Sequence, residues 1–195
     1  MTLDFTELHG RHVELVQLSP EHGPALTEAV QDGELWRLWY TIVPSPEEMD
    51  TEIARRLDLQ AKGTMHPFTV MDAQGVPVGM TSFMNIDAAA PRVEIGSTWY
   101  AARVQKTALN TEAKLLMLAH AFDQLDCLAV ELRTHFMNHA SRRAIERLGA
   151  KLDGVLRNHM RMADGSIRDT CVYSVTSGDW PAVRNNLEWQ LRKSR

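Results

Sequence analysis

The amino-acid sequence predicts a mixed α/β fold of the α+β type, with a mostly antiparallel central sheet of about seven strands flanked by helices. Two observations support this prediction. The hydrophobic period changes from 3.6 residues to 2 and back again along the chain. In the second half the order strand, helix, strand, helix implies a crossover and some parallel pairing. The predicted element order is β-α-α-β-β-β-α-β-α-β-β-α.

The first half begins with a strand and two helices. Residues 12–18 alternate polar and apolar, which is typical of a strand with one buried face. Helices are expected over 19–29 and 45–60, because each segment starts with a Ser-Pro pair that supplies a cap and a first-turn proline. Three strands joined by short turns are then expected over 68–71, 78–86 and 93–100.

The second half returns to a helical period. Residues 111–125 form a strongly amphipathic pattern, and a strand is expected over 128–132. A helix over 139–148 is expected to end at Gly149, which tolerates a left-handed conformation. The remaining predicted elements are a hairpin of strands 151–161 and 167–176 and a C-terminal helix over about 179–192.

The expected strand 93–100 has two distinct faces. Simple alternation places Val93, Ile95 and Trp99 on its apolar face. Glu94, Thr98 and Tyr100 then lie on the opposite face.

Composition narrows the function classes. The chain has 195 residues, 44% of them hydrophobic, and a formal net charge of −4, so we expect one domain over 1–195 with a core from about 10 to 176. Mild acidity argues against a nucleic-acid partner, and no apolar run is long enough to span a membrane.

Cys127 and Cys171 lack disulfide-framework and metal-ligand spacing, so no metal is expected. The start has no leader signal, and we expect a cytoplasmic protein.

Residues 99–114 are the segment that says most about function. A strand ends, a short loop follows and a long helix begins, so free backbone N–H groups meet the positive end of a helix. Such a junction is a weak anion-binding signal by itself. A second segment opens a helix with Asn138-x-x-Ser141 and closes it with Glu146-x-x-Gly149.

Together these two segments resemble the GNAT superfamily of acetyl-coenzyme A-dependent N-acetyltransferases, and in particular the branch that includes the ribosomal-protein N-terminal acetyltransferases. The resemblance extends over about residues 10–176. It implies a GNAT-like sheet and acetyl-coenzyme A as co-substrate, without a metal.

The family's phosphate loop reads Gln/Arg-x-x-Gly-x-Gly/Ala. Gln105 matches it, whereas Ala108 and Asn110 replace the two glycines. If Ala108 needs a positive φ, its Cβ costs about 1 kcal/mol. The resemblance implies coenzyme contacts, largely through the main chain, at Trp99, Tyr100, Gln105, Lys106, Thr107, Ala108, Leu109, Asn110, Thr111, Asn138 and Ser141.

The resemblance also suggests catalytic residues. Glu94 is the expected general base, with a solvated strand glutamate as the equally open reading, and His135 is the alternative base. Relatives carry a tyrosine acid where this chain has Ile145, so Ser141 is named as the substitute, with water as its alternative. Helix capping alone also explains why Asn or Ser would stand at positions 138 and 141, at the start of a helix.

The aromatic residues Trp36, Trp39 and Tyr40 follow the first helix. We expect them to contact substrate, but core packing and a homodimer contact are equally open explanations.

Two function hypotheses follow. The first is an N-acetyltransferase that moves an acetyl group from acetyl-coenzyme A to a primary amine, either a peptide N-terminus or a small molecule, by direct attack. The alternative is a degenerate, non-catalytic GNAT-fold module that binds a ligand or partner, suggested by Ala108 and by the absence of the tyrosine.

Overall fold

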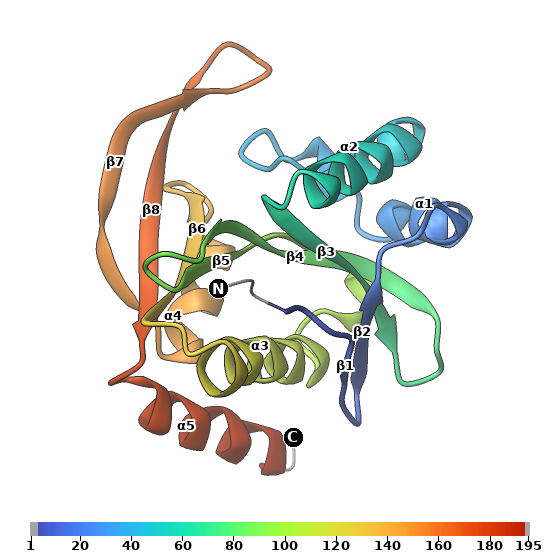
Figure 1. The fold of residues 1–195 in the computed structure, drawn as a ribbon. Helices are drawn as coiled ribbons and strands as arrows, with labels where there is room; N and C mark the ends of the chain where they lie inside the picture. The colour runs from blue at the N-terminus through green and yellow to red at the C-terminus, as the bar shows by residue number, and fades with distance from the viewer. Residues whose placement is uncertain (1–3, 194–195) are drawn as a thin grey trace.

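The computed structural model describes residues 4–193, which build an eight-stranded sheet in the order β1-β2-β3-β4-β5-β6-β8-β7 (Figure 1). All neighbouring strands are antiparallel except β5 and β6. The predicted fold class is confirmed. The added strand is β1, whose two residues are too few to show a period. The strands are β1 Leu8–His9, β2 Val13–Gln17, β3 Met65–Asp72, β4 Pro77–Asp87, β5 Arg92–Tyr100, β6 Ala129–His135, β7 Lys151–Arg161 and β8 Ile167–Thr176.

The five α-helices occupy the segments where the 3.6-residue period predicts them. Ser19 and Ser45 form capping boxes before short 3₁₀ turns that lead into the first two helices. The predicted helix 111–125 starts two residues earlier than expected and continues as a π-helical turn over His120–Gln124. The α-helices are α1 Gly23–Gln31, α2 Met49–Ala61, α3 Leu109–Ala119, α4 His139–Leu148 and α5 Trp180–Arg192.

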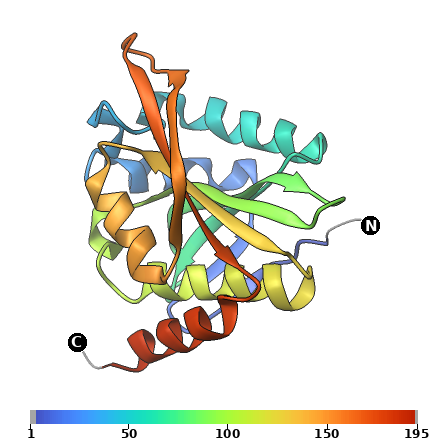
Figure 2. The same ribbon diagram turned by 90° about the vertical axis from the view of Figure 1, so that its left-hand side faces the viewer.

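The helices cover the two faces of the sheet (Figures 1 and 2). Helices α1 and α2 pack on one face, called the α2 face here, and α3, α4 and α5 pack on the other, the α3 face. Arg56 of α2 is fully buried, where it pairs with Glu52 at 2.7 Å and donates to Ser82 Oγ of β4 at 3.3 Å. This contact fixes α2 against the centre of the sheet.

The β7–β8 hairpin extends beyond the helical layers as a long arm (Figure 2). Its tip and the segment between α1 and α2 rise on the same side of the sheet (Figure 1). Within residues 4–193, no helix combines the length and the apolar character that crossing a bilayer requires.

A β-bulge shapes strand β5. Met80 pairs with Trp99 and Ser82 pairs with Gly96, so Ser97 and Thr98 of β5 oppose the single residue Thr81 of β4, and Ser97 adopts φ 50°. The extra residue reverses which face the following side chains take. Trp99 therefore shares the α2 face with Glu94, and Thr98 turns towards α3. The expectation that Trp99 lies with Val93 and Ile95 is wrong, because alternation cannot reveal a bulge.

A buried amine lies beneath this bulge. Lys114 of α3 is 5% exposed, and its Nζ donates to Thr81 Oγ1 and Thr98 Oγ1, both at 3.2 Å. No carboxylate within residues 4–193 forms an ion pair with it. Burial lowers the pKa of Lys114 to about 7.

Candidate active site

Strands β5 and β6 separate after a short parallel contact. They pair only from Arg92 to Glu94 of β5 and from Ala129 to Glu131 of β6. Beyond Glu94 the edge of β5 that points towards β6 has no strand partner in the described residues. Exposed N–H and C=O groups along such an edge can pair with an extended ligand. The bulge at Ser97 bends β5 and keeps this opening in the middle of the sheet.

The loop after β5 leads directly into α3. It contains a 3₁₀ turn over Ala102–Val104, and the Gln105 side chain folds back to donate to Tyr100 O at 2.9 Å. Lys106 takes the left-handed conformation, with φ 60°. Ala108 is right-handed, with φ −68° and ψ −22°. The strain expected at Ala108 is therefore absent, because the left-handed position of this loop is two residues earlier.

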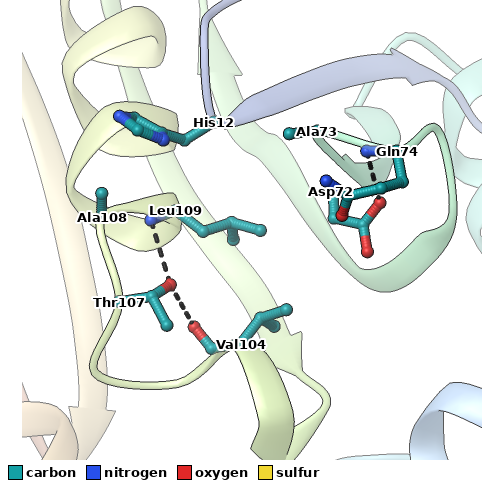
Figure 3. Close-up of a pocket in the computed structure, with 8 residues that line it drawn as sticks. All are labelled: His12, Asp72, Ala73, Gln74, Val104, Thr107, Ala108 and Leu109. Carbon is teal, nitrogen blue, oxygen red and sulfur yellow. Dashed lines mark hydrogen bonds between the residues drawn. The ribbon is translucent and has the colours of Figure 1, made fainter.

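The start of α3 presents unpaired donors. Thr107 Oγ1 donates to Val104 O at 2.7 Å and accepts from Leu109 N at 3.3 Å, which orders the loop (Figure 3). The positive end of the helix dipole adds to the field of any free N–H group here. Four backbone N–H groups at this point have no hydrogen-bond partner within residues 4–193, namely those of Thr107, Ala108, Asn110 and Thr111.

A small cavity lies beside this loop (Figure 3). Its volume is about 160 Å³, and its walls come from His12, the β3–β4 turn at Asp72 to Gln74, and the loop from Val104 to Leu109. Sites for drug-sized ligands measure roughly 300 to 1,000 Å³. This cavity is therefore smaller than the usual site of a drug-sized ligand.

Glu94 lies where β5 leaves β6. Its side chain faces the α2 face and the residue is only 6% exposed, so the solvated-glutamate reading is wrong. Its Oε2 accepts from Asn85 Nδ2 at 2.7 Å and lies 3.3 Å from Arg133 Nε. Burial raises the pKa of the Glu94 carboxyl, although Arg133 and Asn85 oppose that rise. A Cβ on Gly96 would lie 2.9 Å from Glu94 Oε1, so glycine at 96 leaves room for the carboxylate.

His135 ends β6 on the same face. Its Nδ1 accepts the Met137 N–H at 3.0 Å, so the proton of the neutral ring is on Nε2. This Nε2 is buried and has no partner in the described residues. Burial lowers the pKa of His135. A ring with its proton on Nε2 donates there and cannot accept a proton, so the geometry does not favour His135 as the alternative base.

Two of the three predicted aromatic residues reach this face. The Trp39 ring lies 5.2 Å from the His135 ring and 5.5 Å from the Tyr40 ring, edge-on in both cases. Trp39 is 53% exposed. Trp36 instead packs against the core, with the Arg37 guanidinium 6.0 Å above its ring. The structure therefore groups Trp39 and Tyr40 with His135 and leaves Trp36 apart.

The other predicted coenzyme residues have local structural roles. Asn138 Oδ1 accepts from Ser141 N at 3.0 Å, so Asn138 caps α4, and its Nδ2 has no partner in the described residues. The Ser141 hydroxyl forms no hydrogen bond there, and nothing links it to Glu94. The side chains of Trp99 and Tyr100 pack into or against the core, and Trp99 Nε1 and Tyr100 Oη are buried without partners in the described part of the chain.

Sequence reasoning missed three residues around Glu94 and His135: Asn85, Arg133 and Arg168. Alternation along β6 was a usable signal for Arg133, because residues 133 and 135 lie on one strand face. Asn85 lies beside Glu94 because β4 and β5 pair in this register, and Arg168 depends on the register between β6 and β8. No local pattern predicts either register.

Comparison with known proteins agrees with this geometry. A family profile described as an acetyltransferase (GNAT) domain matches residues 12–151. The chain belongs to the GNAT acetyltransferase family. As a member, it is an acyltransferase that uses acetyl-coenzyme A. Within residues 4–193, no group of three or more His, Cys, Asp or Glu side chains is arranged to hold a metal ion.

Solved acetyltransferase structures are similar over nearly the whole chain. One from T. thermophilus is 32% identical, with a TM-score of 0.85, and the match covers 98% of this chain and 100% of the other. A GCN5-related N-acetyltransferase from Brucella melitensis is 29% identical, with a TM-score of 0.86, covering 98% of this chain and 87% of that one.

More distant structures share the fold. Mycobacterium smegmatis RimJ, solved in complex with CoA-disulfide, is 19% identical with a TM-score of 0.79, covering 95% of this GNAT chain and 93% of its own. No protein of curated function matches the sequence significantly. Nothing in these comparisons favours the non-catalytic alternative, and the right-handed Ala108 removes one of its two reasons.

Proposed function

We propose that this GNAT acetyltransferase is an N-acetyltransferase that acts on a primary amine, either a peptide N-terminus or a small molecule. The observation that carries the proposal is the buried Glu94 carboxylate at the point where β5 and β6 separate. A carboxylate with a raised pKa is a suitable acceptor for the proton of an incoming ammonium group.

The coenzyme would bind along two features already described. The N–H groups of Thr107, Ala108, Asn110 and Thr111 form a donor set suited to a diphosphate at a helix N-terminus. The open edge of β5 from Ser97 to Tyr100 offers main-chain groups to an extended arm that carries amides. Gln105, Lys106 and Leu109 shape this loop, since Gln105 ties it to Tyr100 O and Leu109 N bonds to Thr107.

The reaction proceeds by attack of the free amine on the thioester carbonyl carbon, so that a C–N bond forms and the C–S bond breaks. An amine of pKa about 8 to 10 is mostly protonated at pH 7, and Glu94 takes its proton. A β5 backbone N–H at the opening stabilises the oxyanion. Ser141 is the proposed proton donor to the leaving thiolate, with water as the alternative.

The activity test combines purified protein, acetyl-coenzyme A and a panel of amines and peptides, with thiol release followed by a chromogenic reagent. We expect thiol release to depend on the amine and on time. Calorimetry gives an independent readout, because binding of coenzyme A does not require turnover. Absence of coenzyme binding at millimolar concentration would remove the proposal.

Asn138 allows capping and coenzyme contact to be separated. Asn138→Ala loses both the cap and the Nδ2 donor, so we expect the free energy of unfolding to fall by about 1 kcal/mol and the KM for acetyl-coenzyme A to rise. Asn138→Asp keeps an oxygen that can cap Ser141 N but lacks the Nδ2 donor. Its stability should be retained while KM still rises. An unchanged KM in Asn138→Asp would mean that Asn138 is a cap and nothing more.

One surface suits the predicted homodimer. Strand β7 is the edge of the sheet, and Leu152, Leu156 and Met160 on it are exposed. If a second copy pairs there, light scattering should give twice the monomer mass, and Leu156→Asp should return it to the monomer value. The cytoplasmic location stays a prediction.

A further inference from the structure

An unsatisfied donor lies on the α2 face of β6, four residues beyond Glu131, which pairs with Glu94. Because Met137 N occupies His135 Nδ1, the buried Nε2–H of His135 needs an acceptor that the described residues do not supply. Leaving a buried donor unpaired costs about 1 to 3 kcal/mol. His135 is only 5% exposed, so bulk water does not readily replace that partner. A ligand oxygen would satisfy the donor.

Arg168 adds a cation on the same face that forms no ion pair within residues 4–193. Its Nε donates to Thr170 Oγ1 at 2.8 Å, and Thr170 Oγ1 also forms a hydrogen bond with His159 Nδ1 at 3.0 Å. This network orients the guanidinium of Arg168. Its two terminal nitrogens make no hydrogen bond or ion pair within residues 4–193, although the residue is half-buried. A planar guanidinium with free N–H groups matches the two oxygens of a carboxylate.

Strand register brings these groups together. His135 of β6 pairs with Thr170 of β8, and Arg168 lies two residues from Thr170 on the same face. In addition to burial, the charge of Arg168 lowers the pKa of His135, and it opposes the rise in the pKa of Glu94. Of the other charges near these groups, Arg133 bonds Glu131 and Asp169 bonds Arg157, whereas the Asp164 carboxylate bonds only Ser166 among the described residues.

We infer that the acceptor is an amine that carries a carboxylate a few bonds from its nitrogen, held by Arg168 and His135 while its amino group meets Glu94. This inference rests on the proposed N-acetyltransferase function and adds the substrate class. The negative carboxylate of Glu94 complements the positive amino group of such a substrate. The positive charge of Arg168 and the N–H donor of His135 complement its negative carboxylate. The exposed ring of Trp39 and the neighbouring ring of Tyr40 lie over His135 and border the same position.

The experiment compares each acid with its amide at three spacings: glycine with glycinamide, β-alanine with β-alaninamide, and γ-aminobutyrate with its amide. Rates are expressed per concentration of free amine base, because the acid and amide forms differ in amine pKa. We expect kcat/KM to favour the acid by tenfold to about a hundredfold at one spacing at least, the range of a charge-assisted hydrogen bond.

Three variants assign the effect, with the acid-to-amide ratio as the readout. Arg168→Met should bring the ratio close to 1, and Arg168→Lys should retain part of it. His135→Phe keeps a ring against Trp39 but removes the donor, and should lower the ratio. The matched control is Arg161→Met, which removes an exposed hairpin arginine whose guanidinium donates to Gly165 O and should leave the ratio unchanged.

The outcomes separate the two proposals. Turnover of acids and amides at equal efficiency in the unmodified enzyme would overturn the inference and leave the N-acetyltransferase function standing. A preference for acids that survives Arg168→Met would overturn it as well. If acetyl-coenzyme A binds but no amine in a broad panel is acetylated, the proposed function fails and the inference fails with it.

Discussion

Replacing Glu94 with glutamine is expected to lower kcat by a factor of about 10² to 10⁴, with a much smaller change in the KM for acetyl-coenzyme A. Glutamine keeps the size of the side chain and its bond to Asn85 but cannot accept a proton. Glu94 is buried beside Arg133 at the opening between β5 and β6, so solvent base has limited access to replace it. Steady-state kinetics with a saturating amine measures the effect.

The pH profile tests the same role. Burial raises the pKa of Glu94 above its ordinary value of 4.5, so kcat should rise with pH as this carboxyl loses its proton, and the acidic limb should lie closer to neutrality than for an exposed glutamate. The Glu94→Gln variant should lack that limb. Glu131→Gln is the matched control, since Glu131 also bonds Arg133 but has a lowered pKa. Retention of about a third or more of kcat by Glu94→Gln would show that another group takes the proton.

Replacing Lys114 with methionine is expected to raise the free energy of unfolding by about 2 to 4 kcal/mol at pH 7. The pKa of Lys114 falls from 10.5 to about 7 in the folded state, which corresponds to about 4 kcal/mol at pH 7. Methionine has a similar length and no charge, and it loses only the bonds to Thr81 and Thr98. These two hydroxyls still bond each other at 2.7 Å. Denaturation at pH 7 measures the gain.

The sign of the pH dependence follows from the direction of the shift. Between pH 7 and 10.5 the unfolded chain holds the Lys114 proton and the folded chain does not, so this group makes stability rise with pH over that window. Lys114→Met should flatten the rise, and its advantage should shrink towards pH 10. Lys62→Met, at an exposed lysine paired with Asp58, should change neither quantity appreciably. Parallel pH profiles for the unmodified protein and Lys114→Met would contradict the assignment.

The sequence by itself determined the elements whose signals are local. Helix α4 and both strands of the late hairpin have the predicted bounds, 139–148, 151–161 and 167–176. Their caps, turns and periods depend on residues only a few positions apart, so the local sequence is enough to predict these elements. The loop before α3 and the Asn138 helix opening were also visible, and with them the GNAT resemblance that the family comparison confirms.

Tertiary structure alone decided the details of the site. The bulge at Ser97 turns Trp99 to the face of Glu94, and it depends on how β4 pairs with β5. Arg168 bonds Thr170, which pairs with His135 because β6 and β8 pair in one register, although these residues are far from His135 in sequence. Burial of Lys114 likewise follows from α3 packing over the bulge. Register and burial arise from contacts distant in sequence, whose energies no local window contains. The sequence therefore predicted the fold and the loop that leads into α3, and packing decided which charged groups lie on the same face as Glu94.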